Sequence, residues 1–128
     1  MTTPLVCLMI VAFLPYFCAW TGAYYKMRQF GSLDNKTPRE QTAKLQGAGA
    51  RIAAAQANAW EALPLFTAAV IASQLGHAAP GRAAWLSELF VATRILHPIF
   101  YATDLDKLRS LVFLVGLFCV AALFVSAL

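Results

Sequence analysis

Long apolar segments separated by shorter polar connections run through the whole chain. Each apolar segment has about twenty residues or more, which is the length that a helix needs to cross a lipid bilayer. Apolar and polar residues do not alternate in steps of two, so no segment has the pattern of a half-buried β-strand. The pattern predicts an all-α fold, an integral membrane four-helix bundle in a single domain over residues 1–128, with its apolar segments at residues 5–25, 50–77, 82–103 and 108–128.

Helix-breaking and helix-capping residues mark the connections. Residues 26–47 are polar and contain several Gly, Asp, Asn and Pro residues, so the first connection is long. The Thr-Pro-Arg-Glu sequence at 37–40 is typical of a helix N-terminus, with proline in the first turn. It predicts that a helix restarts there and continues through Gly47 and Gly49 into the second apolar segment. The other two connections are short, so the helices that they join should be antiparallel neighbours: residues 78–81 and 104–107.

The amino-acid composition favours a membrane protein. Of the 128 residues, 60% are hydrophobic and 12% are charged, whereas an ordinary soluble domain is about 45–50% apolar. Three cysteines, Cys7, Cys18 and Cys119, lie in apolar segments and lack the spacing of a metal site or a disulfide framework. We therefore expect these thiols to pack inside the bundle or against lipid, and we expect no metal site.

Most of the positive charge lies in two of the connections and their flanks. The net charge is +4, and the opposite end of the predicted bundle carries only Arg82. The positive-inside rule then places the first and third connections in the cytoplasm and both termini on the non-cytoplasmic side. The basic residues are not interleaved with stacking aromatic residues, so we expect membrane lipid and no nucleic acid as a partner. Eight basic residues carry this pattern: Lys26, Arg28, Lys36, Arg39, Lys44, Arg51, Lys107 and Arg109.

Two stripes of polar residues interrupt the second and third apolar segments. Arg94, His97 and Tyr101 are spaced by three and four residues, so they share one face of a helix. The preceding segment carries a second stripe of Arg51, Asn58 and Glu61. An ionisable residue at bilayer depth is costly and normally faces a bundle interior or a polar cavity. Two such stripes on neighbouring helices therefore predict a binding site.

Counting residues along the helices predicts which of these groups meet. At 1.5 Å per residue, Glu61 lies roughly 15 Å beyond Arg51, and Arg94 lies roughly 14 Å before Thr103. Glu61 and Arg94 thus fall at a similar depth, and we expect a buried ion pair between them. The pocket would open toward the cytoplasm, with Arg51 and Arg109 near its mouth.

Each of these residues also has an interpretation without a ligand. The Glu61–Arg94 pair could serve mainly to set the register of two helices, and His97 could be an ordinary histidine satisfied within the bundle. Tyr101 could be an aromatic anchor at the membrane interface, and Arg109 could be a positive-inside residue.

The motifs together resemble the MAPEG family, the membrane-associated proteins in eicosanoid and glutathione metabolism. The resemblance covers nearly the whole chain, and the third helix is most similar to the microsomal prostaglandin E synthase branch; the chain resembles a bacterial-type member. It implies a homotrimer of four-helix protomers, residence of such a member in the bacterial inner membrane, and a glutathione site at the cytoplasmic side between protomers. The matching motifs are Arg51-x6-Asn58-x2-Glu61-Ala62-Leu63-Pro64-Leu65-Phe66, Arg94-x2-His97-x3-Tyr101 and Leu108-Arg109-Ser110.

The resemblance also implies a role for each matching residue. Asn58 and Glu61 would hold the backbone and ammonium of glutathione, while His97 and Tyr101 would line its binding groove. Arg109, after a one-residue gap in the preceding loop, matches the arginine that stabilises the thiolate, and Ser110 matches a residue beside the thiol. Arg94 matches the partner of the glutamate carboxylate, and Arg51 would add positive charge to the pocket.

The sequence is therefore compatible with three functions. The first is an enzyme, a glutathione transferase or peroxidase that acts on a lipophilic small molecule. The second is a non-catalytic lipid-binding or scaffold member, because Ala54 and Ala62 replace an arginine and a tyrosine that are common in the family. The third is a purely structural trimeric bundle or a subunit of a larger complex.

Overall fold

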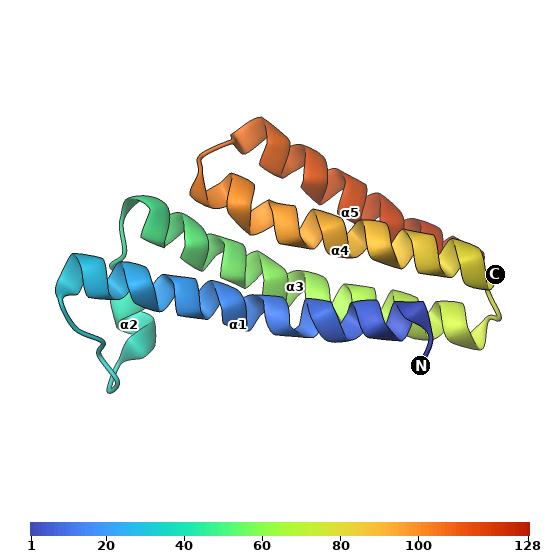
Figure 1. The fold of residues 1–128 in the computed structure, drawn as a ribbon, viewed down its shortest axis with the longest axis horizontal. Coiled ribbons are helices and arrows are strands. Elements are labelled where there is room, and N and C mark those ends of the chain that lie inside the picture. Colours follow the sequence, from blue (N-terminus) through green and yellow to red (C-terminus); the bar gives the residue numbers. More distant parts are fainter.

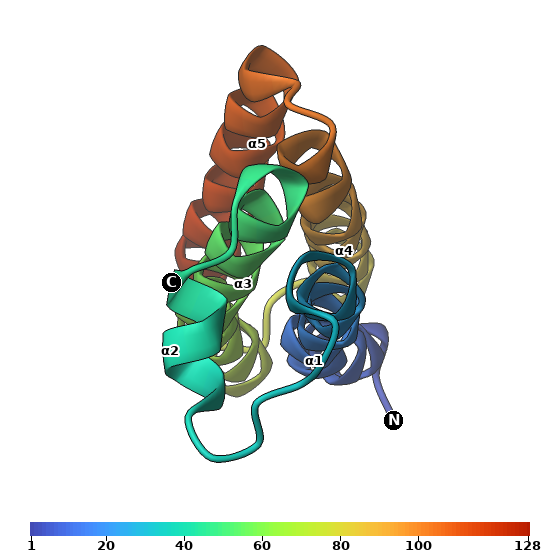
Figure 2. The ribbon, with the colours of Figure 1, turned by 90° about the vertical axis from the view of Figure 1, so that its left-hand side faces the viewer.

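The computed structural model describes all residues 1–128 and contains helices only, so the predicted all-α class is confirmed (Figure 1). Four of the helices are long and lie side by side, while the short α2 lies beside the end of α1 and the start of α3 (Figures 1 and 2). The helices are α1 (Thr3–Phe30), α2 (Pro38–Ala43), α3 (Gly47–Leu75), α4 (Pro80–Ala102) and α5 (Asp106–Ser126).

The predicted continuous helix from residue 38 through Gly47 and Gly49 is wrong, because α2 and α3 are separate helices. Gly47 has a φ of +57°, in the left-handed region that a continuous right-handed helix excludes. The break between α2 and α3 also lets Leu45 turn inward, where it is buried. Gly49 remains inside α3 at a close approach to α1, since a Cβ there would lie 3.0 Å from the Cβ of Tyr25.

The connections have the predicted arrangement along the bundle. The α1–α2–α3 and α4–α5 connections lie at one end, while both termini and the α3–α4 turn lie at the other (Figure 1). The helix α1 extends beyond the predicted residue 25 and ends at Gly31, whose φ of +76° forms a left-handed C-cap. Polar residues at helix ends add turns that the apolar pattern does not reveal.

The core lies where α3, α4 and α5 face one another and α1. Phe66 and Phe90 stack with ring centroids 4.1 Å apart, and Val11 and Leu123 are buried against the same cluster. All three cysteines are free and buried, as expected for packing residues.

Two helices, α1 and α5, are long and apolar enough to cross a membrane. Their outer faces carry large exposed apolar side chains such as Phe13, Trp20 and Phe118, which suits contact with lipid. The helices α3 and α4, which carry the two polar stripes, do not pass the same test.

Candidate functional site

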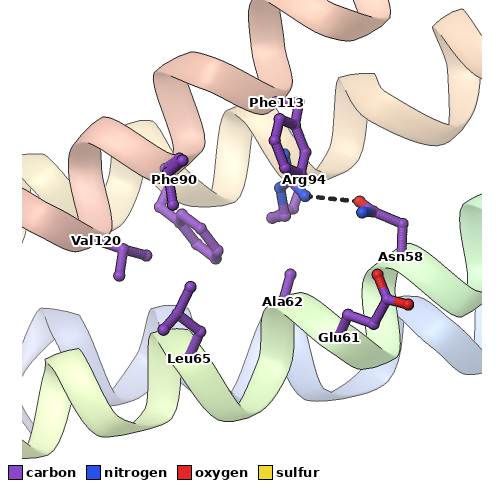
Figure 3. Close-up of a pocket in the computed structure, with 9 residues that line it drawn as sticks. Asn58, Glu61, Ala62, Leu65, Phe90, Arg94, Phe113 and Val120 are labelled. Carbon is purple, nitrogen blue, oxygen red and sulfur yellow. Dashed lines mark hydrogen bonds between the residues drawn. The ribbon is translucent and has the colours of Figure 1, made fainter.

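Arg94 joins the two polar stripes, but its partner differs from the one that the sequence predicts. Its Nη1 donates a hydrogen bond of 3.0 Å to Oδ1 of Asn58, and Nε and Nη2 have no hydrogen-bond partner (Figure 3). The predicted ion pair between Arg94 and Glu61 is therefore wrong. Asn58 lies only three residues from Glu61, about 4.5 Å along α3, and a long arginine side chain reaches either depth. Glu61 is exposed on α3, and it lines a cavity instead of pairing with Arg94.

The guanidinium of Arg94 is enclosed by aromatic and small residues. The side chain is 5% exposed, and its Cζ lies 5.5 Å from the ring centroid of Phe90 and 5.9 Å from that of Phe113. Cation–π attraction partly offsets the cost of burying the charge. Gly116 on α5 provides room, because a Cβ there would lie 3.1 Å from Nη2 and 2.9 Å from Oγ1 of Thr93.

One cavity of about 550 Å³ brings together six of the eight predicted site residues. Three helices contribute to it, α3, α4 and α5, from positions that are up to 60 residues apart, Ala54 and Leu114. Ala54, Ala57, Phe113 and Leu114 add apolar surface to its wall. We call it the polar cavity, and its predicted site residues are Asn58, Glu61, His97, Tyr101, Arg109 and Ser110.

Arg109 and His97 flank the ring of Tyr101 inside the polar cavity. The Cζ of Arg109 lies 4.5 Å from the ring centroid of Tyr101, and the His97 ring meets the same ring edge-on with centroids 5.7 Å apart. Cation–π attraction holds the guanidinium over the aromatic ring. This leaves its edge free to donate hydrogen bonds to a ligand anion.

The remaining two predicted residues, Arg51 and Arg94, are not among the residues that line the polar cavity. Nε and Nη2 of Arg51 donate hydrogen bonds of 3.3 and 3.1 Å to the carbonyl of Ala102. That carbonyl is one of the last in α4, so Arg51 caps this helix end and tethers it to α3. Arg94 is instead hydrogen-bonded to Asn58 and lines a second cavity.

A second cavity of about 170 Å³ adjoins the polar one, and Asn58, Glu61 and Phe113 belong to both walls. Figure 3 shows Leu65 and Ala62 of α3 pointing across it toward Phe90 and Val120. Its lining is mainly apolar, with Arg94 at one side. We call it the apolar cavity.

The sequence interpretation missed Phe90, Phe113 and Gly116. They lie in uninterrupted apolar segments, where any one residue looks like every other packing residue. The only available signal was helical spacing, since Phe90 lies one turn before Arg94 on the same face of α4.

Comparison with known proteins identifies the family to which the chain belongs. The family model of the MAPEG family matches residues 3–128. No curated protein and no solved structure shows significant similarity to the chain. Because the match covers almost all of the sequence, including every residue of the polar cavity, the chain belongs to the MAPEG family.

Proposed function

We propose that the protein is a membrane-bound glutathione-dependent transferase or peroxidase that acts on lipophilic electrophiles. The observation that carries this proposal is the polar cavity, in which a carboxylate, an amide, an imidazole, a phenol, a guanidinium and a hydroxyl converge. Members of the family generally use glutathione, and these groups complement an ammonium, a peptide and a thiolate.

Asn58 and Glu61 offer complementary polarity to an amino-acid group. A guanidinium only donates hydrogen bonds, so Arg94 orients the Asn58 oxygen toward itself and leaves the Asn58 amide N–H groups for a ligand. Glu61, one helical turn further along α3, only accepts when ionised. A zwitterionic γ-glutamyl end would place its ammonium at Glu61 and a carbonyl or carboxylate oxygen at Asn58.

Arg109 supplies the positive charge that favours a thiolate. An ordinary thiol has a pKa of about 8.5 and is only a few per cent ionised at neutral pH. Lowering that pKa by about two units requires about 2.7 kcal/mol of preferential thiolate stabilisation. A guanidinium in a partly desolvated cavity can supply this, and the hydroxyl of Ser110 can donate a further hydrogen bond.

The thiolate sulfur would then attack an electrophilic carbon and form a C–S bond while the leaving group departs with the electron pair. With a hydroperoxide, the sulfur would instead attack the terminal oxygen, so the O–O bond would break and the alkoxide would leave with the electron pair and take up a proton as the alcohol. The resulting glutathione sulfenic acid would condense with a second glutathione to give the disulfide and water. The apolar cavity shares part of its wall with the polar cavity, which supports access for a lipophilic substrate from the bilayer.

The proposal also includes the branch of the family, the membrane and its orientation, and the oligomeric state. We place the chain closest to the microsomal prostaglandin E synthase branch, as a bacterial-type protein of the inner membrane with four membrane-spanning helices. Both termini would be non-cytoplasmic, because the basic connections lie at the opposite end of the bundle (Figure 1). The small residues of α3 permit close helix approach, which supports oligomerisation without setting the number of protomers, and the homotrimer of this proposal is taken from the family resemblance.

The proposal is tested with purified protein in detergent. Wild type should be stabilised by glutathione, show thiolate absorbance and conjugate a generic electrophile. Arg109→Ala should lower turnover about 25-fold at neutral pH, because a rise of about two units in the thiol pKa, from about 6.5 to about 8.5, lowers the ionised fraction from about three quarters to about 3%. Arg109→Lys is the matched variant, and it should retain part of the activity because it keeps the charge. Equal turnover in wild type and Arg109→Ala would refute the proposal.

A second candidate, a non-catalytic lipid-binding or scaffold protein, rests on one observation. Arg109 is the only lysine or arginine in the wall of the polar cavity, since Ala54 and Ala57 occupy the neighbouring positions on α3. Glutathione has two carboxylates, so one of them lacks a cationic partner within this chain. Bound lipid in the purified protein, together with no melting-temperature change on adding glutathione, would favour this candidate over the enzyme.

A further inference from the structure

A groove at the far end of α1 is separate from both cavities described above. It has a volume of about 130 Å³ and lies where α1, α2 and α3 meet. Figure 2 views the bundle from this end, with α2 at one side of the bundle beside α1 and α3. The residues used below are Ala19, Gly22, Lys26, Arg39, Thr42 and Ala53.

The inner half of the groove is a narrow slot between α1 and α3, lined mainly by small residues and with Gln56 of α3 in its wall. Gly22 is buried, yet a Cβ added there would meet no heavy atom within 4 Å. Ala19 and Ala53 flank the same space with small side chains. One turn before Ala53 on α3, the backbone of Gly49 approaches α1 closely, since a Cβ added at Gly49 would lie 3.0 Å from the Cβ of Tyr25. The two helices therefore touch at Gly49 and leave room for a narrow apolar chain at Gly22.

The outer half of the groove is cationic. Nζ of Lys26 donates a hydrogen bond of 3.0 Å to the carbonyl of Pro38, which ties α1 to the first turn of α2. Thr42 donates to the same carbonyl at 2.9 Å. Arg39, the next residue of α2, is exposed and forms no hydrogen bond or ion pair through its side chain. The groove thus ends in one tethered ammonium and one free guanidinium.

The charge of the whole molecule is concentrated around this end. Residues 26–51 contain six basic and two acidic residues, so they carry +4, which equals the net charge of the chain. Asp34, one of the two acids, accepts hydrogen bonds from the backbone of Lys36 and from the backbone and hydroxyl of Thr37. These bonds lower the pKa of Asp34 below its ordinary value and hold the carboxylate within its own turn.

We propose that this groove binds one anionic phospholipid, with the phosphate diester at Arg39 and Lys26 and one acyl chain in the slot at Gly22. The helix α1 is apolar enough to span a membrane, and Lys26 lies one turn beyond Gly22 toward its polar end. This spacing puts the slot at acyl depth and the cations at headgroup level. Basic clusters next to a membrane helix attract anionic lipids at about 1 kcal/mol per residue, or about fivefold in affinity. The site is independent of the polar cavity.

The test compares two lipids that differ only in their headgroup. The full chain, purified in detergent, is given phosphatidylglycerol or phosphatidylcholine with identical acyl chains, and bound lipid is counted by native mass spectrometry alongside the melting temperature. Wild type should retain phosphatidylglycerol preferentially, and Arg39→Gln should retain it about fivefold more weakly. Gly22→Leu should lose the bound lipid, because its side chain fills the slot; it should still fold, since a helix interior favours leucine over glycine.

Lys107→Gln provides the matched control, because it removes the same charge from the other connection at that end of the molecule. Equal loss of lipid in Lys107→Gln and Arg39→Gln would overturn the proposal, since it would show attraction to overall charge only. Three other results would overturn it as well. They are retention of the bound lipid by Gly22→Leu, the absence of a headgroup preference in wild type, and stabilisation by inorganic phosphate equal to that by phosphatidylglycerol. A glutathione-binding defect without lipid loss would bear only on the polar cavity.

Discussion

Arg94→Met tests whether the buried guanidinium serves the fold or the ligand site. The substitution removes one hydrogen bond from a charged donor, the 3.0 Å bond to Asn58, and such bonds contribute about 1.5–3 kcal/mol. It also removes two buried nitrogens without partners, Nε and Nη2, each of which costs about 1–3 kcal/mol. Methionine keeps the apolar contacts of the stem with Phe90 and Phe113. The opposing terms are of similar size, so stability should change by less than about 2 kcal/mol in either direction.

Ligand binding should respond differently to the same change. Without Arg94, nothing fixes the orientation of the Asn58 amide, so its N–H groups are no longer presented to the polar cavity. We expect glutathione affinity to fall about tenfold, the equivalent of about 1.4 kcal/mol. The assay pairs the melting temperature without ligand with a glutathione titration, and Arg82→Met at the opposite end serves as the control. Loss of more than about 3 kcal/mol of stability, or an unchanged affinity for glutathione, would refute the reasoning.

Three further predictions concern single contacts. Gly116→Ala should destabilise the fold by about 1–3 kcal/mol, because the added Cβ would lie 3.1 Å from Nη2 of Arg94; an unchanged melting temperature would contradict this. Arg51→Met should lower stability by about 1–2 kcal/mol through loss of its hydrogen bonds to the carbonyl of Ala102, with faster amide exchange at the end of α4 and little effect on glutathione binding. Hydrogen bonds lower the pKa of Asp34, so its turn is stabilised at pH values above the unfolded pKa of about 3.9, and this stabilisation is lost as the pH falls through the lower folded pKa. Amide hydrogen exchange at residues 34–37, corrected for its intrinsic rate, should therefore rise only in acid. Asp34→Ala should remove this pH dependence.

Residue patterns were sufficient to find most of the candidate site. The spacing of Arg94, His97 and Tyr101 predicts one helix face, and their cost in an apolar segment predicts that the face is turned inward. The structure agrees, because His97 and Tyr101 line the polar cavity with Asn58 and Glu61. A residue count along a helix gives depth to within about a turn, and that is enough to predict which helices face each other.

Residue patterns were not sufficient to identify pairwise partners. The choice of Arg94 between Asn58 and Glu61 depends on side-chain direction and helix tilt, neither of which a residue count contains. Arg51 likewise has the sequence features of a pocket cation, but it lies within reach of the end of α4 and caps it. The break at Gly47 depends on its positive φ, a conformation that glycine permits and does not require.

The sequence by itself therefore determined the helical class, the order and approximate bounds of the long helices, and the faces that carry polar groups. These follow from periodicity and from the cost of burying charge, which are properties of a single segment. Only the tertiary structure decided which polar groups meet, that the short α2 is separate, and that cavities adjoin at Asn58 and Phe113. Those features depend on distances between helices, which packing sets to within an ångström and which no single segment encodes.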